Sequence, residues 1–467
     1  MNKLRRIGLR LGAAVLAAVA VAFAVCLDGV DYQPYFRTPY YAATAARLEA
    51  ARTNRLLEAG ELEAGFGRAR LTPGVPALAD DVSKGQFRSL PLAGYGDRRG
   101  RPATGVHDDL FVKAIALRAG RTTVVLVGMD ALIVPREVAL AACAELERDP
   151  HLRREQIYLS ATHTHCSLGG WGEGVVGEAF AGPYQPAARQ WMAARIVTAV
   201  RNAVADLRPA AVGQGSLACA EFVRNRLVGN LGRVDPEFSY LVVRQASGTT
   251  AVLGSFAAHA TVLSGRVMEF SADYPGAWQR GVEKATGGLA VFLAGGVGSS
   301  SPVPGAGGFD GVERMGSALA QRVLERLPQT PVTNQVLLGA LGLEVALPPL
   351  HLRVADHVRL RPWLAARLLP VGNTTFLQGV RLNDTVWLST PCDFSAELAL
   401  GIKDSLRARG LRAVITSFNG DYIGYIIPSR YYHMSGYEPR VMSFFGPNIS
   451  DYLDEFVRRL ARALTQS

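Results

Sequence analysis

Two histidines one residue apart are the clearest sign of chemistry in this sequence. They lie in Thr162-His163-Thr164-His165, directly after a short apolar run at 157–160 that predicts a β-strand. A strand end can direct both imidazoles into one cleft, and neutral imidazole is a good zinc ligand. Paired histidines are also common on surfaces and in cores. The glycine pair Gly169-Gly170 favours a functional site, because glycine lets the backbone approach a ligand closely.

Three further segments carry reactive residue types, and each also has a structural explanation. His259 closes an apolar run from Leu253 to Ala258, where a single histidine is more often structural. Asp273 is typical of an Asx-type turn. The glycine- and serine-rich loop at 295–302 could bind an anion, although it lacks the lysine of a P-loop and the spacing of a dinucleotide-binding loop. It also lacks the G-x-S-x-G pattern of a nucleophile elbow.

Strand and helix patterns alternate along the chain and must position these residues. This alternation predicts an α/β fold, a single large mixed-sheet hydrolase domain over residues 63–467. We find no internal repeat and no linker within that range. The expected strands lie at 124–130, 157–160, 239–244, 251–257, 289–294, 335–346 and 413–417, and the expected helices at 136–148, 186–207, 310–327, 394–408 and 449–464.

The N-terminus predicts export. Basic residues from Lys3 to Arg10 precede a charge-free run of 17 residues, Leu11 to Leu27, so residues 1–30 are expected to form a signal anchor that starts inside. Ala22-Phe23-Ala24 keeps a cleaved signal peptide as the alternative. Both place the domain outside the cytoplasm, at the periplasmic or extracellular face, and cleavage would release it. Residues 31–62 are expected to be a juxtamembrane linker, helical over 42–62.

Composition excludes several classes. Of 467 residues 49% are hydrophobic and 19% charged, which excludes a disordered, collagen-like or coiled-coil protein. Five cysteines are too few for a disulfide scaffold. Four of the positive charges behind the net charge of +10 lie in the first ten residues, and no basic block carries interleaved aromatics. We therefore expect no nucleic-acid partner, and no protein partner is evident.

Taken together and in order, eleven segments of this chain resemble the neutral/alkaline (non-lysosomal) ceramidase family. Each segment is weak alone, and their shared order carries the resemblance. The family's C-terminal immunoglobulin-like domain is expected to be missing here. The matching segments are Gly65 to Pro73, Leu92 to Gly96, Gly105 to Ala114, Ser160 to His165, Asn225-Arg226, Phe256 to His259, Ser271 to Gly276, Gly298 to Pro302, Thr390 to Phe394, Asn419 to Tyr425 and Gly436 to Glu438.

The resemblance implies hydrolysis of the amide bond of N-acylsphingosine with one zinc ion (Zn2+). By motif, the implied zinc ligands are His163, His259, Asp393 and Tyr425, and the implied catalytic or substrate-lining residues are His165, Arg226, Ser301 and Tyr437. Two positions depart from the family pattern. Asp393 replaces the usual Glu and is shorter by one methylene, and the loop before Ser301 lacks an Asp that is common there.

Amide hydrolysis needs a strong nucleophile at neutral pH, and zinc lowers the pKa of a bound water to about 7. We expect zinc-bound hydroxide to attack the carbonyl while Tyr437 and protonated His165 donate to the oxyanion, each worth on the order of 3 kcal/mol. His165 or a neighbouring acid would protonate the leaving amine. Attack by Ser301 through an acyl-enzyme is the competing chemistry and needs a base within reach.

The expected partners are a lipid amide substrate and, through the N-terminal segment, a membrane. Two other functions remain open: a zinc hydrolase of another amide or ester in the cell envelope, and a catalytically silent, anchored binding protein. Cys166 and Cys392 flank predicted site residues and are expected to be small buried groups. His107 is a weaker candidate for the site.

Overall fold

The computed structural model describes residues 2–466 as a mixed α/β protein, which confirms the predicted fold class. Its centre is a 12-stranded mixed sheet with strand order β12-β10-β9-β7-β2-β14-β17-β18-β20, while β4, β5 and β6 continue from β2. The bounds are β2 Leu56–Arg70, β4 Phe111–Ala119, β5 Thr122–Met129, β6 Ile157–Ala161, β7 Arg208–Ala218, β9 Glu237–Gln245, β10 Thr250–Phe256, β12 Leu289–Ala294, β14 Gln335–Ala346, β17 Thr374–Leu382, β18 Thr385–Ser389 and β20 Arg412–Thr416.

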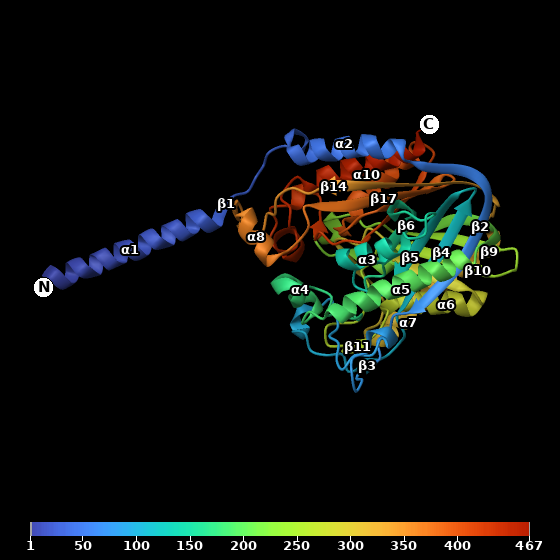
Figure 1. Cartoon of the computed structure of the whole chain (residues 1–467), viewed down its shortest axis with the longest axis horizontal. Coiled ribbons are helices and arrows are strands. Elements are labelled where there is room, and N and C mark those ends of the chain that lie inside the picture. Colours follow the sequence, from blue (N-terminus) through green and yellow to red (C-terminus); the bar gives the residue numbers. More distant parts are fainter. Residues whose placement is uncertain (1, 467) are drawn as a thin grey trace.

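Strand β2 is long and curved, and its two parts pair with different neighbours (Figure 1). Residues 56–61 pair with β14, and residues 62–70 pair with β4. Gly65 and Gly67 lie on this second part, under helix α5 (Pro186–Ala205). A Cβ at either glycine would lie 2.1 Å from a carbonyl oxygen of α5. These glycines therefore let the helix pack directly on the strand backbone.

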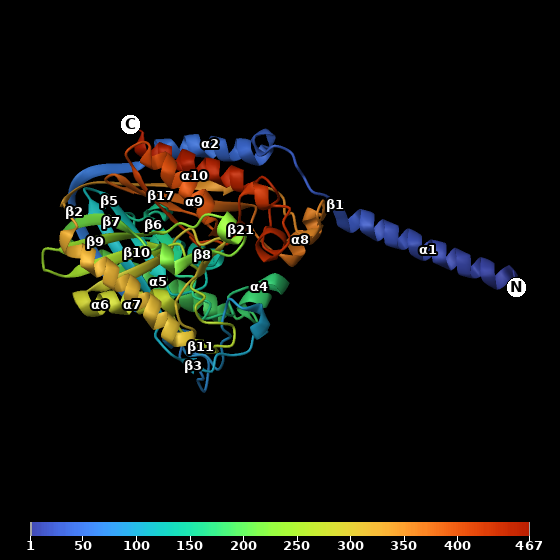
Figure 2. The same cartoon turned by 180° about the vertical axis from the view of Figure 1, so that it is seen from behind.

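The inner faces of the strands pack against one another, and the helices cover the outer faces (Figures 1 and 2). All twelve strands contribute to the inner core, with side chains such as Leu117, Leu253 and Val380. Three outer cores join the sheet to helix pairs: α3 (Arg136–Leu146) with α5, α6 (Asp273–Thr286) with α7 (Gly308–Arg326), and α9 (Ala396–Arg407) with α10 (Ile449–Thr465).

At the N-terminus, helix α1 (Asn2–Cys26) extends away from the domain (Figure 1). Within the described residues, one helix is long and apolar enough to cross a membrane, over Arg6–Cys26. It leads directly into β1 (Leu27–Gly29). This short strand pairs with β16 (Val358–Leu360), which pairs in turn with β15 (Arg353–Ala355).

The expected helix at 42–62 differs from the structure. The helix is α2 (Pro39–Thr53), and from Leu56 onward the chain forms β2. Alanine, leucine and glutamate favour a helix locally, but pairing with β14 and β4 overrides that preference. Helix α2 is also packed on the domain, where the buried Thr44 hydroxyl lies 2.6 Å from the hydroxyl of Tyr452. The segment is thus part of the packed domain rather than a free linker.

Candidate metal centre and active site

The predicted histidines and Asp393 meet at one end of the sheet. His163 follows β6, His259 follows β10, and Asp393 follows β18. Parallel pairing of β5 with β6, β10 with β12 and β18 with β20 brings the carboxyl ends of these strands to the same edge. This edge is where ligand sites form in α/β sheets.

Three buried side chains form a group that could hold a metal ion. One ligand atom from each of His163, His259 and Asp393 lies within 4.8 Å of the others. Asp393 Oδ1 is 3.0 Å from His259 Nε2 and 3.6 Å from His163 Nε2. The three side chains are almost fully buried, because each of the three residues is at most 3% exposed.

Backbone carbonyls fix which histidine nitrogens face the centre. His163 Nδ1 lies 2.7 Å from the carbonyl oxygen of Leu132, and His259 Nδ1 lies 2.9 Å from that of Ser300. A carbonyl can only accept, so both Nδ1 atoms carry the proton and both Nε2 lone pairs face Asp393.

Asp393 Oδ1 is buried and has no hydrogen-bond partner among the described residues. Converging lone pairs are stabilised by a cation, and two imidazoles with a carboxylate suit a divalent ion with nitrogen and oxygen ligands. The residues present therefore fit a divalent metal ion, but they do not identify the element.

Burial keeps the two histidines in the form that binds metal. It lowers the pKa of His163 and of His259 to about 3, so both imidazoles are neutral at physiological pH. Burial also raises the pKa of Asp393, with His163 acting in the opposite direction. The close approach of His259 to Asp393 is consequently a contact between acceptors and not an ion pair.

Tyr425, the fourth predicted ligand, lies at the edge of this centre. Its hydroxyl is 3.0 Å from His259 Nε2 and accepts a hydrogen bond of 2.8 Å from Arg226 Nη2. Arg226 also donates through Nε to Glu438 at 2.6 Å, and the second carboxylate oxygen of Glu438 accepts from Ser299. The predicted Arg226 is thus held at the centre by a buried carboxylate that sequence reasoning missed.

Asp393 is oriented from two sides. The hydroxyl of Tyr422 donates to Asp393 Oδ2 at 2.8 Å, which leaves Oδ1 for the centre. The glycine loop lies behind it, where a Cβ at Gly298 would be 2.7 Å from the Asp393 carbonyl oxygen. Three N–H groups of this loop, those of Gly295, Gly298 and Ser300, are bonded to backbone carbonyls and are therefore not free to bind an anion.

His165 lies beside the centre, with its Nε2 3.3 Å from His163 Nε2. The ring of Tyr95 packs on it at 4.7 Å, and Gly94, at φ 109°, leaves room for it: a Cβ there would lie 2.7 Å from the His165 ring. Burial lowers the pKa of His165 well below 6.5. The expected protonated His165 is therefore wrong for the resting site, because the buried ring is neutral.

Ser301 is placed differently from the other predicted residues. It lies in β13 (Ser300–Pro302), opposite Arg224 of β8 (Val223–Asn225), and it does not line the cavity next to the metal-type centre. Over residues 2–466, no side-chain hydrogen bond joins it to the site. Its neighbours make those contacts, through the Ser299 hydroxyl and the Ser300 carbonyl.

Strained backbone accompanies the site. His163, Ser299 and Phe418 have φ of 65°, 65° and 61°, a region that residues other than glycine rarely adopt. The His163 ring stacks on Phe418 with centroids 3.9 Å apart and planes 8° from parallel. Strain of this kind is maintained where surrounding contacts over-determine the conformation, which is typical of functional sites.

A cavity of about 440 Å³ opens onto the centre, within the usual range for ligand pockets. Asp393, Tyr425 and Tyr437 contribute to its wall together with His163 and His165. The ring of Tyr437 packs edge-on against Tyr425 at 5.8 Å, and burial raises its pKa to about 12. Tyr437 therefore keeps its proton.

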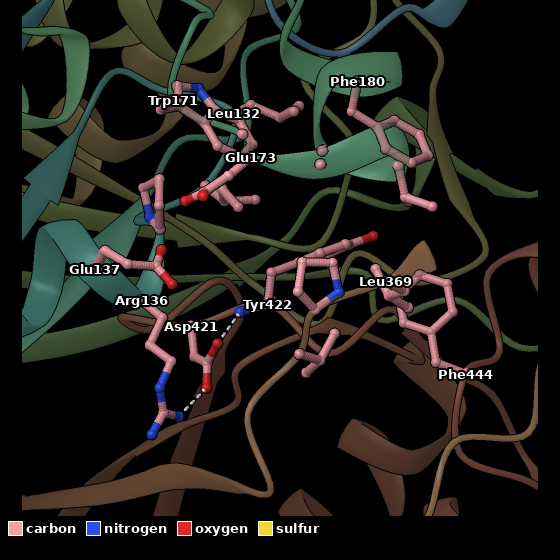
Figure 3. Close-up of a pocket in the computed structure, with 18 of the residues that line it drawn as sticks. Leu132, Arg136, Glu137, Trp171, Glu173, Phe180, Leu369, Asp421, Tyr422 and Phe444 are labelled. Atoms are coloured by element: carbon pink, nitrogen blue, oxygen red, sulfur yellow. Dashed lines mark hydrogen bonds and ion pairs between the residues drawn. The ribbon is translucent and has the colours of Figure 1, made fainter. Parts of the chain in front are cut away.

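The cavity has an apolar side and a charged side (Figure 3). Phe180, Leu369 and Phe444 lie on one side, whereas Arg136 and Asp421 lie on the other and form an ion pair of 2.9 Å. Further apolar lining comes from helix α4 (Gly174–Ala181) and from residues 369–372. Such a cavity suits an amphiphilic ligand with a long apolar part.

The weaker candidates lie elsewhere. His107 stacks on Phe309 at 3.5 Å and does not line the cavity. Cys166 and Cys392 are fully buried, and burial raises the pKa of both thiols. Both cysteines are packed as the sequence predicted.

Fold and site together define an α/β protein with a buried metal-type centre that opens into an amphiphilic cavity. Residues 79–295 match the family described as neutral/alkaline non-lysosomal ceramidase, N-terminal. The chain is 26% identical over 269 residues to the neutral ceramidase of Pseudomonas aeruginosa and 27% identical over 231 residues to that of Mycobacterium tuberculosis. The resemblance is confirmed over this range: residues 79–295 match the N-terminal part of the neutral/alkaline non-lysosomal ceramidase family.

The matches differ in extent. The aligned parts cover 50% and 45% of this chain but only 40% and 36% of the two relatives, so the chain spans about two fifths of their length. In fold, it matches the crystal structure of the Pseudomonas aeruginosa enzyme with a TM-score of 0.70 at 20% identity, over 86% of this chain and 74% of that one. A ceramidase complexed with C2 gives 0.71 at 18% identity, over 86% and 75%.

Proposed function

We propose that this protein is a zinc-dependent amidohydrolase that cleaves the N-acyl amide bond of ceramide-like lipids to a fatty acid and a sphingoid base. The observation that carries the proposal is the convergence of three buried lone-pair atoms, from His163, His259 and Asp393, at the wall of a largely apolar cavity. Neutral ceramidases among its relatives support the substrate class.

We assign the metal to His163, His259, Asp393 and Tyr425. Two imidazoles and a carboxylate are a frequent catalytic zinc set, with a position left open for chemistry. When bound, the ion supplies Lewis acidity, which polarises a carbonyl and lowers the pKa of water. Tyr422 donates to Oδ2 of Asp393, so Oδ1 is the carboxylate oxygen that would hold the ion.

The other residues handle protons and charge. Tyr437 keeps its proton, faces the cavity and donates to the oxygen that gains charge in the transition state. His165 is neutral, and its Nδ1 is buried without a partner in the described chain, so it can accept a proton and deliver it to the leaving amine. Arg226 positions the Tyr425 hydroxyl. Ser301 acts indirectly, by maintaining the strand whose Ser300 carbonyl orients His259.

The apolar side of the cavity takes an acyl chain, and the N-terminal helix holds the enzyme near its substrate. We propose that residues 1–30 are the signal anchor, that the hydrolase domain begins with α2, and that it lies outside the cytoplasm. A tethered enzyme meets lipid at a high effective concentration.

A second candidate is hydrolysis of a different amide or ester, one with a charged end. The charged side of the cavity favours it: Arg189 pairs with Glu173 at 3.3 Å, and Arg136 pairs with Asp421, all at the cavity wall. Such groups would recognise a polar head larger than the hydroxyls of a sphingoid base. A panel of amides and esters with neutral and charged heads separates the two candidates.

The primary test measures fatty-acid release from a fluorescent ceramide together with bound metal by mass spectrometry. Full-length protein is assayed alone, with chelator and after added zinc, beside His163→Ala and the exposed control His151→Ala. We expect chelator-sensitive release that zinc restores, lost in His163→Ala and kept in His151→Ala. One bound zinc without release would favour the second candidate. Neither zinc nor release would indicate a silent binding protein.

A further inference from the structure

The base of the apolar helix α1 is hydrogen-bonded to the domain. Leu27 and Gly29 of β1 pair with Leu360 and Val358 of β16. The carbonyl of Cys26, the last residue of α1, accepts a 2.8 Å bond from the N–H of Arg361. No free linker separates the helix from the domain along this stretch of the described chain, so the sheet fixes which face of the domain lies around the base of α1.

Helix α8 (Pro362–Leu368) begins at the next residue and forms one edge of that face. Its Trp363 is 47% exposed, and the guanidinium of Arg367 lies 5.4 Å from the indole ring. The chain then continues into residues 369–372, which line the cavity. Helix α8 thus joins the base of α1 to the cavity wall.

Helix α4 forms the opposite edge. Its Val175 is 71% exposed, while Val176 and Phe180 line the cavity. A Cβ at Gly174 would lie 3.6 Å from the ring of Pro370, so the two edges meet. Figures 1 and 2 both show α4 and α8 on the side of the domain from which α1 leaves.

We propose that α4 and α8 form a membrane-docking surface that rests on the lipid bilayer around the emerging α1 and places the cavity mouth at the lipid headgroups. Tryptophan prefers the membrane–water interface, and arginine is attracted to lipid phosphates. Exposed Val175 would gain by burial in lipid. Because α1 is long and apolar enough to span a membrane and its base is hydrogen-bonded beside this surface, we identify a lipid bilayer as the occupant. Docking rests on the proposed N-terminal anchor, and the identity of the lipid that enters rests on the proposed hydrolysis.

Docking is measured without turnover. Full-length Cys26→Ser protein, whose other cysteines are buried, is reconstituted in phosphatidylcholine vesicles with one added cysteine carrying an environment-sensitive fluorophore. The labelled sites are Val175→Cys on α4 and Ala366→Cys on α8, both exposed. The matched control is the exposed Ala246→Cys, in the turn between β9 and β10 at the end of the domain far from α1 (Figure 1).

We expect nitroxide-bearing lipids to quench roughly half or more of the emission at both test sites, because interfacial groups lie within ~10 Å of the headgroups, and to leave the control unchanged. Test sites that stay unquenched in vesicles that retain the protein would overturn the proposal, and so would equal quenching at the control. Trp363→Ala should slow hydrolysis of ceramide in vesicles and spare a water-soluble short-chain amide. A protein that docks but hydrolyses neither the ceramide nor the short-chain amide would refute the proposed function and leave the docking proposal standing.

Discussion

Replacing Tyr422 by Phe removes one hydroxyl and leaves its ring. That hydroxyl donates a 2.8 Å hydrogen bond to Oδ2 of the buried Asp393. The bond holds the carboxylate so that its Oδ1 faces the two histidines. The aromatic contact of Tyr422 with Phe418, 6.2 Å between centroids, remains in Tyr422→Phe. The variant therefore tests one contact to one proposed metal ligand.

The size of the effect follows from the charge on the acceptor. A hydrogen bond to a charged group contributes about 1.5–3 kcal/mol, and each 1.4 kcal/mol is tenfold in a dissociation constant. Zinc affinity should fall roughly 10- to 100-fold, as for other groups that orient metal ligands. Burial already raises the pKa of Asp393, and the Tyr422 bond lowers it. Without that bond the proton competes more strongly, so the loss should be larger at pH 6 than at pH 8.

The assay is a competition titration of zinc against a chromophoric chelator at both pH values. Tyr240→Phe is the matched control, since it also removes a buried tyrosine hydroxyl, one that contacts Thr330 Oγ1 at 2.8 Å far from the centre. Wild-type zinc affinity in Tyr422→Phe at both pH values would refute the reasoning. An equal loss in Tyr240→Phe would point to general destabilisation instead.

Three further changes test other parts of the site. Gly94→Ala puts a Cβ 2.7 Å from the His165 ring and should reduce turnover of ceramide at least tenfold while zinc stays bound. The control is Gly96→Ala, whose Cβ would lie 3.3 Å from its nearest neighbour and should change turnover little in the same assay. Glu438→Gln, which leaves the partly exposed Arg226 guanidinium without its counter-charge, should lower the free energy of unfolding in urea by about 2 kcal/mol. An unchanged value would contradict this expectation. Burial raises the pKa of Asp273 from 3.8 to about 7, so the folded state holds this proton more tightly than the unfolded chain does. The free energy of unfolding should therefore fall as the pH rises from about 4 to about 7, by at most ~4 kcal/mol. In chelator-treated Asp273→Asn, the pH dependence measured by urea unfolding should be flatter.

From the sequence pattern, we could predict only those site residues that directly follow an apolar, strand-forming run. His163 and His259 each follow an apolar run, and parallel strands deliver their ends to one edge. Asp393 and Tyr425 carried no such signal, and only the family resemblance indicated them. Their partners could not be predicted, because Tyr422 and Glu438 reach the site through contacts 29 and 212 residues apart in the chain.

Local composition gave a wrong prediction where strand pairing determines the secondary structure. The stretch at 42–62 is rich in helix formers, yet its last seven residues form β2 because Leu62 and neighbouring side chains are buried in the inner core. The glycine loop resembled an anion site because two of its N–H partners, the carbonyls of Phe256 and Phe394, lie on strands far away in the sequence. The neutral state of His165 is equally invisible in sequence, since burial sets it.

The two groups that orient the metal-facing histidines are main-chain carbonyls, of Leu132 and Ser300. A mutation replaces a side chain and leaves the carbonyl in place, so no single codon change can delete either orienting group directly. Variation at these two positions in related genes should be tolerated as long as the local chain path is kept. Loss of the centre during evolution would instead be recorded at His163, His259 and Asp393 themselves.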